Sequence, residues 1–341
     1  MRRKIIIAMT LITVAFCGLT SHKAAAQVDP HFSQYYAYPM WLNPGLTGVM
    51  NGDFRITANF KRQWASIADP YQTEALSFDT YPINHFSFGV TVLNQSAGDG
   101  GWNYLNALGA ASYHLILDRG KMNVLSIGVE AGVINRHFDR SKLKFGEQWN
   151  PITGYDPTAP SFEKFDQTSA TNLDVNIGIV YYNRNAYNAV NPFVGVSLYH
   201  LTTPEDPFYS TSDGKLPMRL NIHGGAKIQL SSKFNLTPQL IYLHQGEDYG
   251  AGRAHEFVGS LYGQYMLTNQ SDLLFGVNYR AKDAIIPFVG FHLGDFTLGL
   301  SYDVNTSDLD VASSNQGGIE ISLSYIRHKR IVDPRFICPR L

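Results

Sequence analysis

Charged side chains are scarce in this chain of 341 residues. Only 16% of its residues are charged, against about 25% in an ordinary globular domain, and 27 Lys and Arg nearly balance 28 Asp and Glu. So small a net charge provides no basic surface for nucleic-acid phosphates and gives no support for disorder driven by charge. Nucleic acid is therefore excluded as the main partner.

Cysteine and long apolar runs are also scarce. The one long apolar run, Ile5–Leu19, follows three basic residues and precedes three small ones, Ala24–Ala26. This pattern predicts a secretory signal peptide over residues 1–26, because the run is shorter than the roughly 20 residues of a membrane-spanning helix. Cleavage removes Cys17 and leaves Cys338 as a lone thiol, so an internal disulfide is excluded.

Alternation of apolar and polar residues recurs along the rest of the chain. Ile319, Ile321 and Leu323, for example, alternate with Glu320 and Ser322. A period of two places the apolar set on one face of a strand and the polar set on the other. We predict 14 strands, over residues 53–64, 71–80, 86–93, 104–117, 122–137, 172–182, 190–200, 219–230, 233–243, 254–267, 271–280, 284–292, 295–302 and 317–327.

Short and long connections alternate between these predicted strands. The long ones fall at 94–103, 138–171, 201–218, 244–253 and 303–316. An even strand count with this alternation is typical of an outer-membrane β-barrel whose termini both face the periplasm. The sequence thus predicts an all-β, multi-pass transmembrane barrel of about 14 antiparallel strands in the cell outer membrane.

The expected domain organisation has four parts. Residues 1–26 are the signal peptide, 27–52 an N-terminal segment that is periplasmic or docked in the lumen, 53–327 the barrel, and 328–341 a basic periplasmic tail. A water-soluble β-sandwich is the alternative fold, but its outer face should carry many more charges. Aromatic residues that end the apolar faces favour membrane-interface girdles instead: Tyr181, Tyr242, Tyr265, Tyr279, Tyr302 and Tyr325.

Charges are also expected inside the barrel. Residue parity places there Arg55, Lys61, Arg219, Lys227, Arg280, Glu130, Asp174, Glu256 and Glu320. Their near balance favours pairing across a filled lumen over an ion-selective ring of one sign. A conducting pore stays open as the alternative.

Candidate catalytic residues are few. The 11 histidines are scattered, without metal-ligand spacing. Ser112 and His114 share a strand face, which keeps a membrane hydrolase as a third hypothesis, although many pairs in a polar lumen have this spacing. We expect no enzymatic activity, no cofactor and no metal.

The mature N-terminus combines aromatic residues with Pro and Gly, from Asp29 through Tyr38-Pro39 to Gly48. Pro and Gly at this density exclude a long helix or a central strand, and so many aromatics exclude a disordered linker. We expect the segment to dock, either in the lumen of its own barrel or on a partner.

Short motifs follow one another in order from residue 29 to the end of the chain: Asp29-Pro30 with Phe32-Ser33-Gln34-Tyr35, Asn43-Pro44 with Gly48, Arg62-Gln63-Trp64, Ser141 with Lys142-Leu143, Tyr279-Arg280 with Ala284-Ile285, Ser301-Tyr302-Asp303 with Ser307, Glu320 with Ser322-Leu323, and Cys338-Pro339-Arg340. This ordered set resembles the PorP/SprF family of outer-membrane proteins of the type IX secretion and gliding machinery of Bacteroidetes. Gly45 stands where Ala is commoner in that family, and Phe60-Lys61 where Tyr-Arg is usual.

This resemblance implies a non-enzymatic barrel that anchors a secreted surface adhesin with a type B C-terminal domain, or assists its export. The implied partners are outer-membrane lipid, periplasmic type IX secretion components and that adhesin. A porin or solute transporter is the alternative function. The predicted partner-binding residues are Phe32, Gln34, Tyr35, Tyr36, Pro39, Trp41, Asn43, Pro44, Arg62, Trp64 and Cys338.

Overall fold

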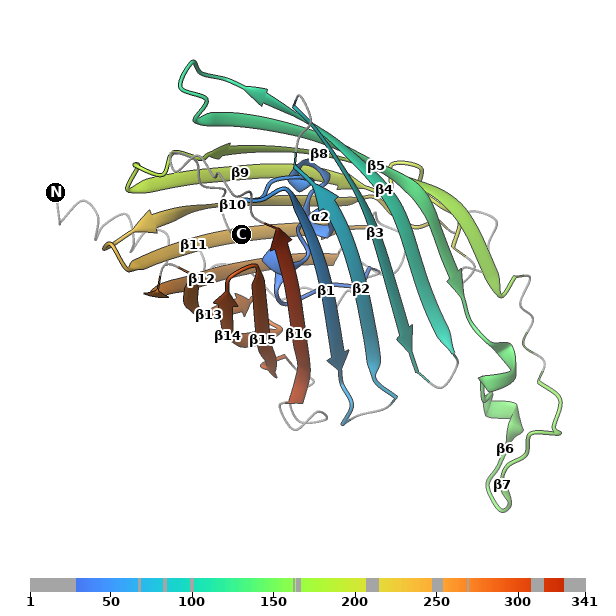
Figure 1. Cartoon of the computed structure of the whole chain (residues 1–341). Coiled ribbons are helices and arrows are strands. Elements are labelled where there is room, and N and C mark those ends of the chain that lie inside the picture. The colour runs from blue at the N-terminus through green and yellow to red at the C-terminus, as the bar shows by residue number, and fades with distance from the viewer. Residues whose placement is uncertain are drawn as a thin grey trace.

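A computed structural model of the chain is a closed barrel of 14 antiparallel strands (Figure 1). Each strand pairs with the next barrel strand in the chain, and the first pairs with the last to close the cylinder. The predicted fold class is therefore confirmed, and the sandwich is excluded. The structure describes residues 29–66, 69–81, 85–98, 101–161, 163, 167–206, 215–246, 254–268, 270–307 and 316–327.

Every predicted strand overlaps an observed one, although several run further than predicted. The strands of the barrel are β1 (Phe54–Gln63), β2 (Tyr71–Thr80), β3 (Phe86–Ala97), β4 (Trp102–Ile116), β5 (Asn123–His137), β8 (Ser169–Asn183), β9 (Val190–Tyr199), β10 (Arg219–Gln229), β11 (Phe234–Gln245), β12 (Ala254–Thr268), β13 (Ser271–Arg280), β14 (Ala284–Leu293), β15 (Phe296–Asn305) and β16 (Gln316–Arg327). The elements outside the wall are η1 (Tyr35–Ala37), α2 (Pro39–Leu42), η2 (Pro44–Leu46), η3 (Arg140–Lys142), η4 (Gly146–Gln148), β6 (Trp149–Asn150) and β7 (Gly154–Tyr155).

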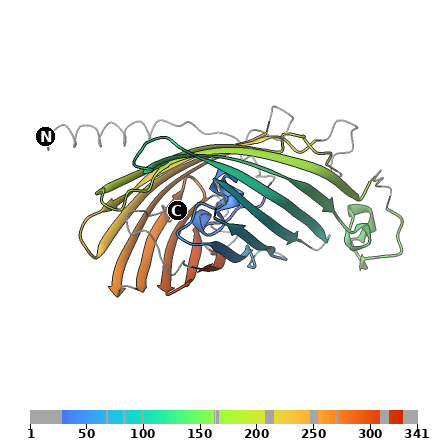
Figure 2. The same ribbon diagram turned by 45° about the horizontal axis from the view of Figure 1, so that its top comes forward.

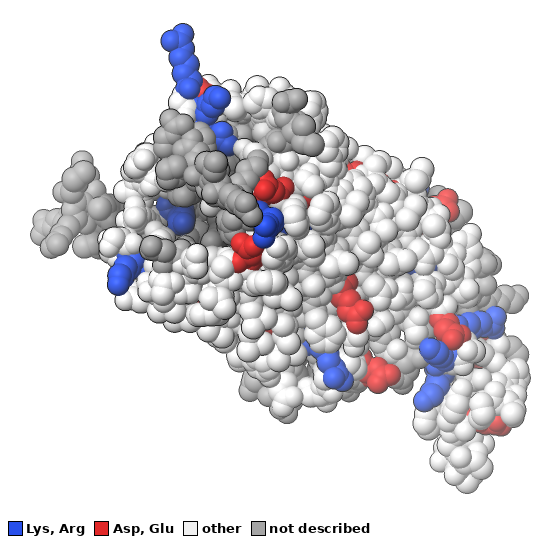
Figure 3. Space-filling view, viewed as in Figure 1, with Lys and Arg blue, Asp and Glu red and all other residues white. Residues whose placement is uncertain are grey.

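The wall is apolar outside and polar inside. On β14 the outward Ile285 and Val289 are 44% and 49% exposed, whereas on β1 the inward Thr57, Asn59 and Lys61 are almost fully buried. Figure 3 shows broad stretches of the wall with few charged side chains. A water-soluble protein has the opposite arrangement, so this outer face suits the hydrocarbon of a membrane.

Aromatic residues on the outer face form two belts. Tyr181, Tyr265 and Tyr325 lie near the ends of strands that finish at the end of the barrel with tight links. Tyr242, Tyr279 and Tyr302 lie toward the opposite end. The six predicted girdle residues therefore divide between the two levels at which membrane interfaces are expected.

The two ends of the barrel differ in their connections. One end, here the short-turn end, has tight links such as Gly294-Asp295, where Gly294 adopts φ 59° as a two-residue link requires. The other, the long-loop end, has the connections 138–168 and 200–218. Loop 138–168 contains the β6–β7 hairpin and projects from the barrel (Figure 1). The predicted long loop at 94–103 is shorter than expected, because β3 extends to Ala97 and β4 begins at Trp102.

The structure does not support the prediction that both termini face the same side. Phe54 and Arg327, the two ends of the barrel, are register partners at the short-turn end. Asp29, the first described residue, instead contacts His200 and Gln245 at the long-loop end. The segment between Asp29 and Phe54 therefore runs through the barrel. The predicted signal peptide and the tail 328–341 lie outside the described residues.

Candidate functional site: the lumen plug

Residues 29–52, the plug, occupy the interior of the barrel (Figure 2). All of residues 29–50 are buried except His31 and Tyr36, which are half-buried. The plug contains only the single turns η1, α2 and η2. Pro39 and Pro44 each begin one of these turns, where a missing backbone N–H does no harm.

Asp29 attaches the start of the plug at the long-loop end. Its Oδ2 lies 2.8 Å from His200 Nε2 and accepts a hydrogen bond of 2.9 Å from Arg219 Nη1. His200 Nδ1 lies 2.9 Å from Asp174 Oδ2 on the wall. The Arg219 guanidinium lies 4.4 Å from the ring centre of Trp41, so a plug aromatic also binds this cation through its ring face.

Glu320 of β16 binds the next part of the plug. Its carboxylate accepts the backbone N–H groups of Ser33 at 2.6 Å and of Gln34 at 3.1 Å. Ser33 Oγ donates to Asp303 at 2.6 Å and accepts a hydrogen bond of 2.9 Å from Lys61. These backbone and hydroxyl groups of the plug are therefore satisfied by charged groups of the wall, which form stronger hydrogen bonds than neutral ones.

Asn43 attaches the middle of the plug to β8 and β9. Its amide nitrogen donates to the carbonyl oxygens of Ile179 at 3.2 Å and Val196 at 3.1 Å, and its oxygen accepts the backbone N–H of Gly45 at 2.8 Å. The side chain thus joins the wall and closes the turn that begins η2.

Glycines of the wall make room for this turn. Gly128 of β5 and Gly178 of β8 are register partners, and both face the turn at Asn43-Pro44. A Cβ on Gly178 would lie 2.9 Å from Asn43 Cγ, and a Cβ on Gly128 would lie 2.4 Å from the carbonyl carbon of Pro44. Only glycine lets the backbone of the plug approach the wall so closely.

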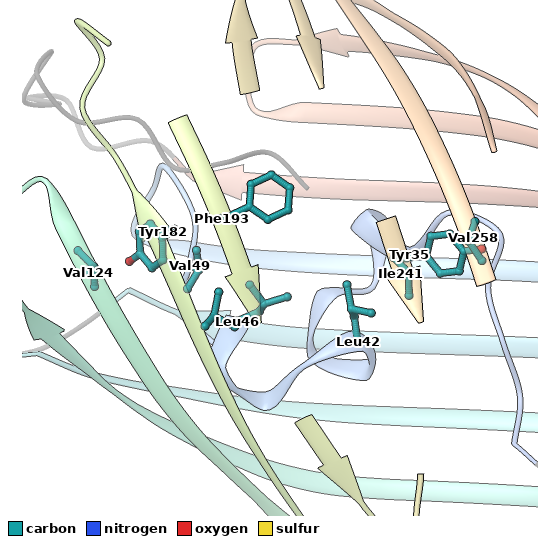
Figure 4. Packing of buried hydrophobic residues seen from close by; sticks show 10 residues of the cluster. Tyr35, Leu42, Leu46, Val49, Val124, Tyr182, Phe193, Ile241 and Val258 are labelled. Atoms are coloured by element: carbon teal, nitrogen blue, oxygen red, sulfur yellow. The ribbon is translucent and has the colours of Figure 1, made fainter. Parts of the chain in front are cut away.

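Apolar side chains of the plug form two clusters with the wall, and Figure 4 shows the first. In the first, Tyr35, Leu42, Leu46 and Val49 pack against Val124, Val180, Tyr182, Phe193, Ile241 and Val258. In the second, Phe32, Tyr38 and Trp41 pack against Ala75, Leu93, Tyr104, Ile134 and Leu216.

The loop that contains Leu216 folds over the long-loop end of the plug. Leu216 is fully buried, and its backbone N–H donates to the carbonyl of Pro204 at 2.7 Å. Asp206 of the same loop pairs with Arg136 of β5. The plug is therefore held between the barrel wall and this loop.

Among the spaces left beside the plug are cavities of about 40 and 130 Å³. The larger lies toward the short-turn end, between the plug and β10–β16, where Tyr36 meets Tyr262 and Phe288 with ring-centre distances of 4.7 and 5.2 Å. The described residues contain no helix long and apolar enough to cross a membrane, and no cluster of His, Cys, Asp and Glu suited to a metal ion.

Comparison with protein families identifies the chain. The model of the type IX secretion system membrane protein PorP/SprF matches residues 24–325, which span both plug and barrel. The chain belongs to the PorP/SprF family. This membership and the barrel fold place the protein in the outer membrane, associated with the type IX secretion system. No curated protein matches the PorP/SprF chain.

Solved structures with a similar fold are outer-membrane barrels. TbuX, the toluene transporter of Ralstonia pickettii, has a TM-score of 0.50 and 11% identity, over 86% of the PorP/SprF chain and 94% of its own. A FadL homologue of Pseudomonas aeruginosa has a TM-score of 0.46 and 11% identity, over 89% and 96%. At such low identity, the likeness shows the fold alone.

Of the predicted partner-binding residues of this PorP/SprF protein, eight lie in the plug: Phe32, Gln34, Tyr35, Tyr36, Pro39, Trp41, Asn43 and Pro44. Seven of them are buried inside the barrel, and Tyr36 is half-buried. Arg62 is exposed on the outer face of β1, and Trp64 follows β1 with its ring 5.3 Å from that of Tyr71. The structure does not bring these two residues together with the other eight. Cys338 lies outside the described residues.

The PorP/SprF barrel does bring Ser112 and His114 together. Ser112 Oγ lies 3.1 Å from His114 Nε2 but donates to the carbonyl of Thr47 in the plug at 2.8 Å. Both are less than 5% exposed. Among the described residues, the His114 ring lies within hydrogen-bonding distance of the hydroxyls of Ser87, Ser112 and Tyr182, and none of these is a carboxylate that could orient the ring for catalysis. The pair belongs to the polar lining under the plug.

Sequence reasoning missed the wall side of this PorP/SprF site. Parity placed Glu320 and Arg219 inward, and both are less than 6% exposed, but it gave no indication of their plug partners. Asp79, which accepts the backbone N–H of Gly48 at 2.8 Å, was not singled out. Its position in the alternation of β2 places Asp79 inside the barrel, opposite Arg55. That position was the signal that could have found it.

Proposed function

We propose that this PorP/SprF protein is a non-enzymatic anchor of the type IX secretion machinery. Its long-loop end holds a secreted surface adhesin with a type B C-terminal domain, and its short-turn end contacts periplasmic secretion components. The observation that carries the proposal is a lumen that the plug occupies from the long-loop end to the short-turn end, combined with a large loop that projects from the long-loop end. With the plug in place, such a barrel offers surfaces rather than a passage.

The projecting loop supports the proposed adhesin contact. At the β6–β7 hairpin, Trp149 and Ile152 are 58% and 93% exposed. Large apolar side chains in water mark binding surfaces when they occur together. The hairpin is nonetheless ordered, because the Trp149 and Tyr155 rings lie 5.9 Å apart and the Lys144 ammonium lies 5.6 Å from the Tyr155 ring centre.

Two turns of the same loop are stabilised by carboxylates. Asp139 accepts hydrogen bonds from the hydroxyl and backbone N–H of Ser141, and these lower the pKa of its carboxyl group. Hydrogen bonds from Thr158 lower the pKa of Asp156 in the same way. A loop held by its own turns loses less conformational entropy on binding a partner.

In this proposal the predicted partner-binding residues that lie in the plug do not touch a partner. Phe32, Tyr35 and Trp41 fix the plug and so keep the barrel rigid and closed. Arg62 lies in the last pair of alternating residues of β1 and Trp64 directly follows that strand. Both therefore lie at the long-loop end, the side proposed for the adhesin. The turns of the short-turn end and the tail that includes Cys338 are the segments proposed to contact the periplasmic secretion components.

A porin or solute transporter is the alternative. The filled lumen disfavours it, and single-channel recording in planar bilayers separates the two. A steady current through the wild-type protein that one class of solute blocks would favour transport over anchoring.

The anchor is tested by deleting the gene and comparing the secreted and surface-attached proteomes. We expect at least one large secreted protein to disappear from the cell surface. Complementation with the double variant Trp149→Ala/Ile152→Ala should not restore it, whereas Leu240→Ala should, because Leu240 is 65% exposed on the outer wall in the middle of β11, away from both ends. An unchanged proteome after gene deletion would overturn the proposal.

A further inference from the structure

The inner wall of the barrel makes most of its ion pairs without the plug. Arg55 donates to both oxygens of Asp79 at 2.9 and 2.7 Å, between β1 and β2. Asp303 of β15 lies 2.8 Å from Arg280 and 3.4 Å from Lys61. Among the ion pairs of the described residues, Asp29 is the one carboxylate that the plug contributes. Most ion pairs of the wall therefore remain when the plug is absent, whereas Arg219 loses its partner Asp29.

The inner wall also contains buried polar atoms that neither the plug nor the wall pairs. The side-chain amides of Asn59 and Asn106 and the hydroxyls of Ser77 and Ser126 are buried and have no hydrogen-bond partner in this structure. A permanent core avoids such groups, because each buried unpaired donor or acceptor is destabilising. Water satisfies all of them once the lumen is wet.

The plug itself combines apolar and polar attachments. Its apolar side chains, chiefly Phe32, Trp41, Leu42 and Leu46, pack on the wall. Beside them lie the hydrogen bonds that Asp29, Ser33 and Asn43 form with wall residues. It joins the wall covalently only at Asp53, whose backbone N–H donates to Arg327 and whose carbonyl accepts from Tyr81 at the short-turn end. Its removal therefore breaks no strand of the barrel, but exposes an apolar surface that keeps the resting barrel closed.

We propose that the barrel has a second, water-filled state, in which the plug has left the lumen and small hydrophilic solutes pass from end to end. The surface left behind is polar and ion-paired within the wall. Its inward charges nearly balance: Arg55, Lys61, Arg136, Arg219, Lys227 and Arg280 against Asp79, Glu130, Asp174, Glu256, Asp272, Asp303 and Glu320. A balanced lining passes cations and anions alike. This activity is independent of the anchoring role.

The first test is current through planar bilayers in potassium chloride. Deleting residues 29–50 retains Asp53 and its hydrogen bonds, and heat-modifiable migration on gels shows whether the barrel has folded. We expect steady ohmic current from the deletion variant, with a reversal potential near zero in a salt gradient, and only brief openings from the wild type. A folded deletion variant without current overturns the proposal.

A disulfide lock provides the second test, should the deletion variant fail to fold. A Cβ on Gly178 would lie 2.9 Å from Asn43 Cγ, so the two Cβ atoms are at most about 4.4 Å apart, within the range of disulfides. The double variant Asn43→Cys/Gly178→Cys, made with Cys338→Ser, should be silent when oxidised and show brief openings when reduced. The control Gly178→Cys with Cys338→Ser carries the same added side chain in the wall and should not respond to oxidation. Equal currents in the oxidised and reduced double variant, or silence in both, contradict the release of the plug.

Discussion

Glu320 of β16 accepts the backbone N–H of Ser33 in a hydrogen bond of 2.6 Å, although 287 residues separate the two in sequence. The same carboxylate accepts the N–H of Gln34. One side chain from the last strand of the barrel thus positions the plug that precedes the first.

Replacing this carboxylate should loosen the plug. Glu320→Ala leaves both N–H groups without their acceptor, and an unpaired buried donor costs about 1–3 kcal/mol. We therefore expect chymotrypsin to cut the aromatic-rich plug faster in detergent than in the wild type, as measured by mass spectrometry of the fragments. Glu320→Gln keeps an acceptor oxygen and should be cut more slowly than Glu320→Ala. Equal cutting of all three proteins would contradict this role for Glu320.

Adding a single methyl group to Gly178, one of the wall glycines that face the plug, should displace the plug. A Cβ on Gly178 overlaps the Asn43 side chain, whereas a Cβ on Gly109 of β4 has 3.8 Å of clearance from its nearest neighbour. Overpacking of this kind costs roughly 1–3 kcal/mol. We expect Gly178→Ala to lower the unfolding temperature and to expose the plug to protease, and Gly109→Ala to do neither. Identical behaviour of the two variants would show that the close approach at Gly178 does not hold the plug.

The ion pair at the long-loop end should show strong coupling in a double-mutant cycle. Arg219→Met leaves the Asp29 carboxylate buried with only His200 beside it, and breaking a buried pair on one side costs about 3–5 kcal/mol. Asp29→Asn combined with Arg219→Met should destabilise the barrel by less than the sum of the two single variants. Denaturant unfolding followed by tryptophan fluorescence measures the three values. Additive effects would mean that the contact contributes little.

A charged side chain on the outer face should destabilise the barrel, and the cost should be largest near the middle of the membrane. Val289 lies near the middle of β14 and faces outward, 49% exposed. Val289→Arg should cost roughly 2–4 kcal/mol when the barrel inserts into lipid. Tyr187→Arg, in a turn at the short-turn end, should cost almost nothing. The fraction of folded barrel recovered in liposomes compares them, and equal recovery would argue against lipid contact at Val289.

The wall of the barrel was predictable because its pattern is local. Ile285, Val289 and their neighbours alternate with inward residues over a single strand, and a period of two can be found without knowing the partner strand. The same parity placed Glu320 and Lys61 inward. Strand ends were less certain, as at Ala97, because alternation continues past the point where a loop was expected.

The plug was only half predictable. Its Pro and aromatic content showed that it docks, but the lumen and a partner remained equal choices. Nothing near Asn43 in sequence indicates that it reaches the carbonyl oxygens of Ile179 and Val196. Nothing near Gly178 in sequence indicates why a glycine is needed there, since the side chain that requires it lies 135 positions earlier. The place of Asp29 was hidden for the same reason, because only tertiary contacts show that it lies at the long-loop end.

The proposed anchor is tested most directly by cross-linking in living cells. A photo-reactive amino acid placed at Ile152, on the tip of the projecting hairpin, should cross-link to a secreted surface protein, whereas the same group at Tyr187 should not. Mass spectrometry identifies the captured protein. No cross-link at Ile152, or the same secreted protein captured equally at Tyr187, would contradict an anchor that works through its long loops.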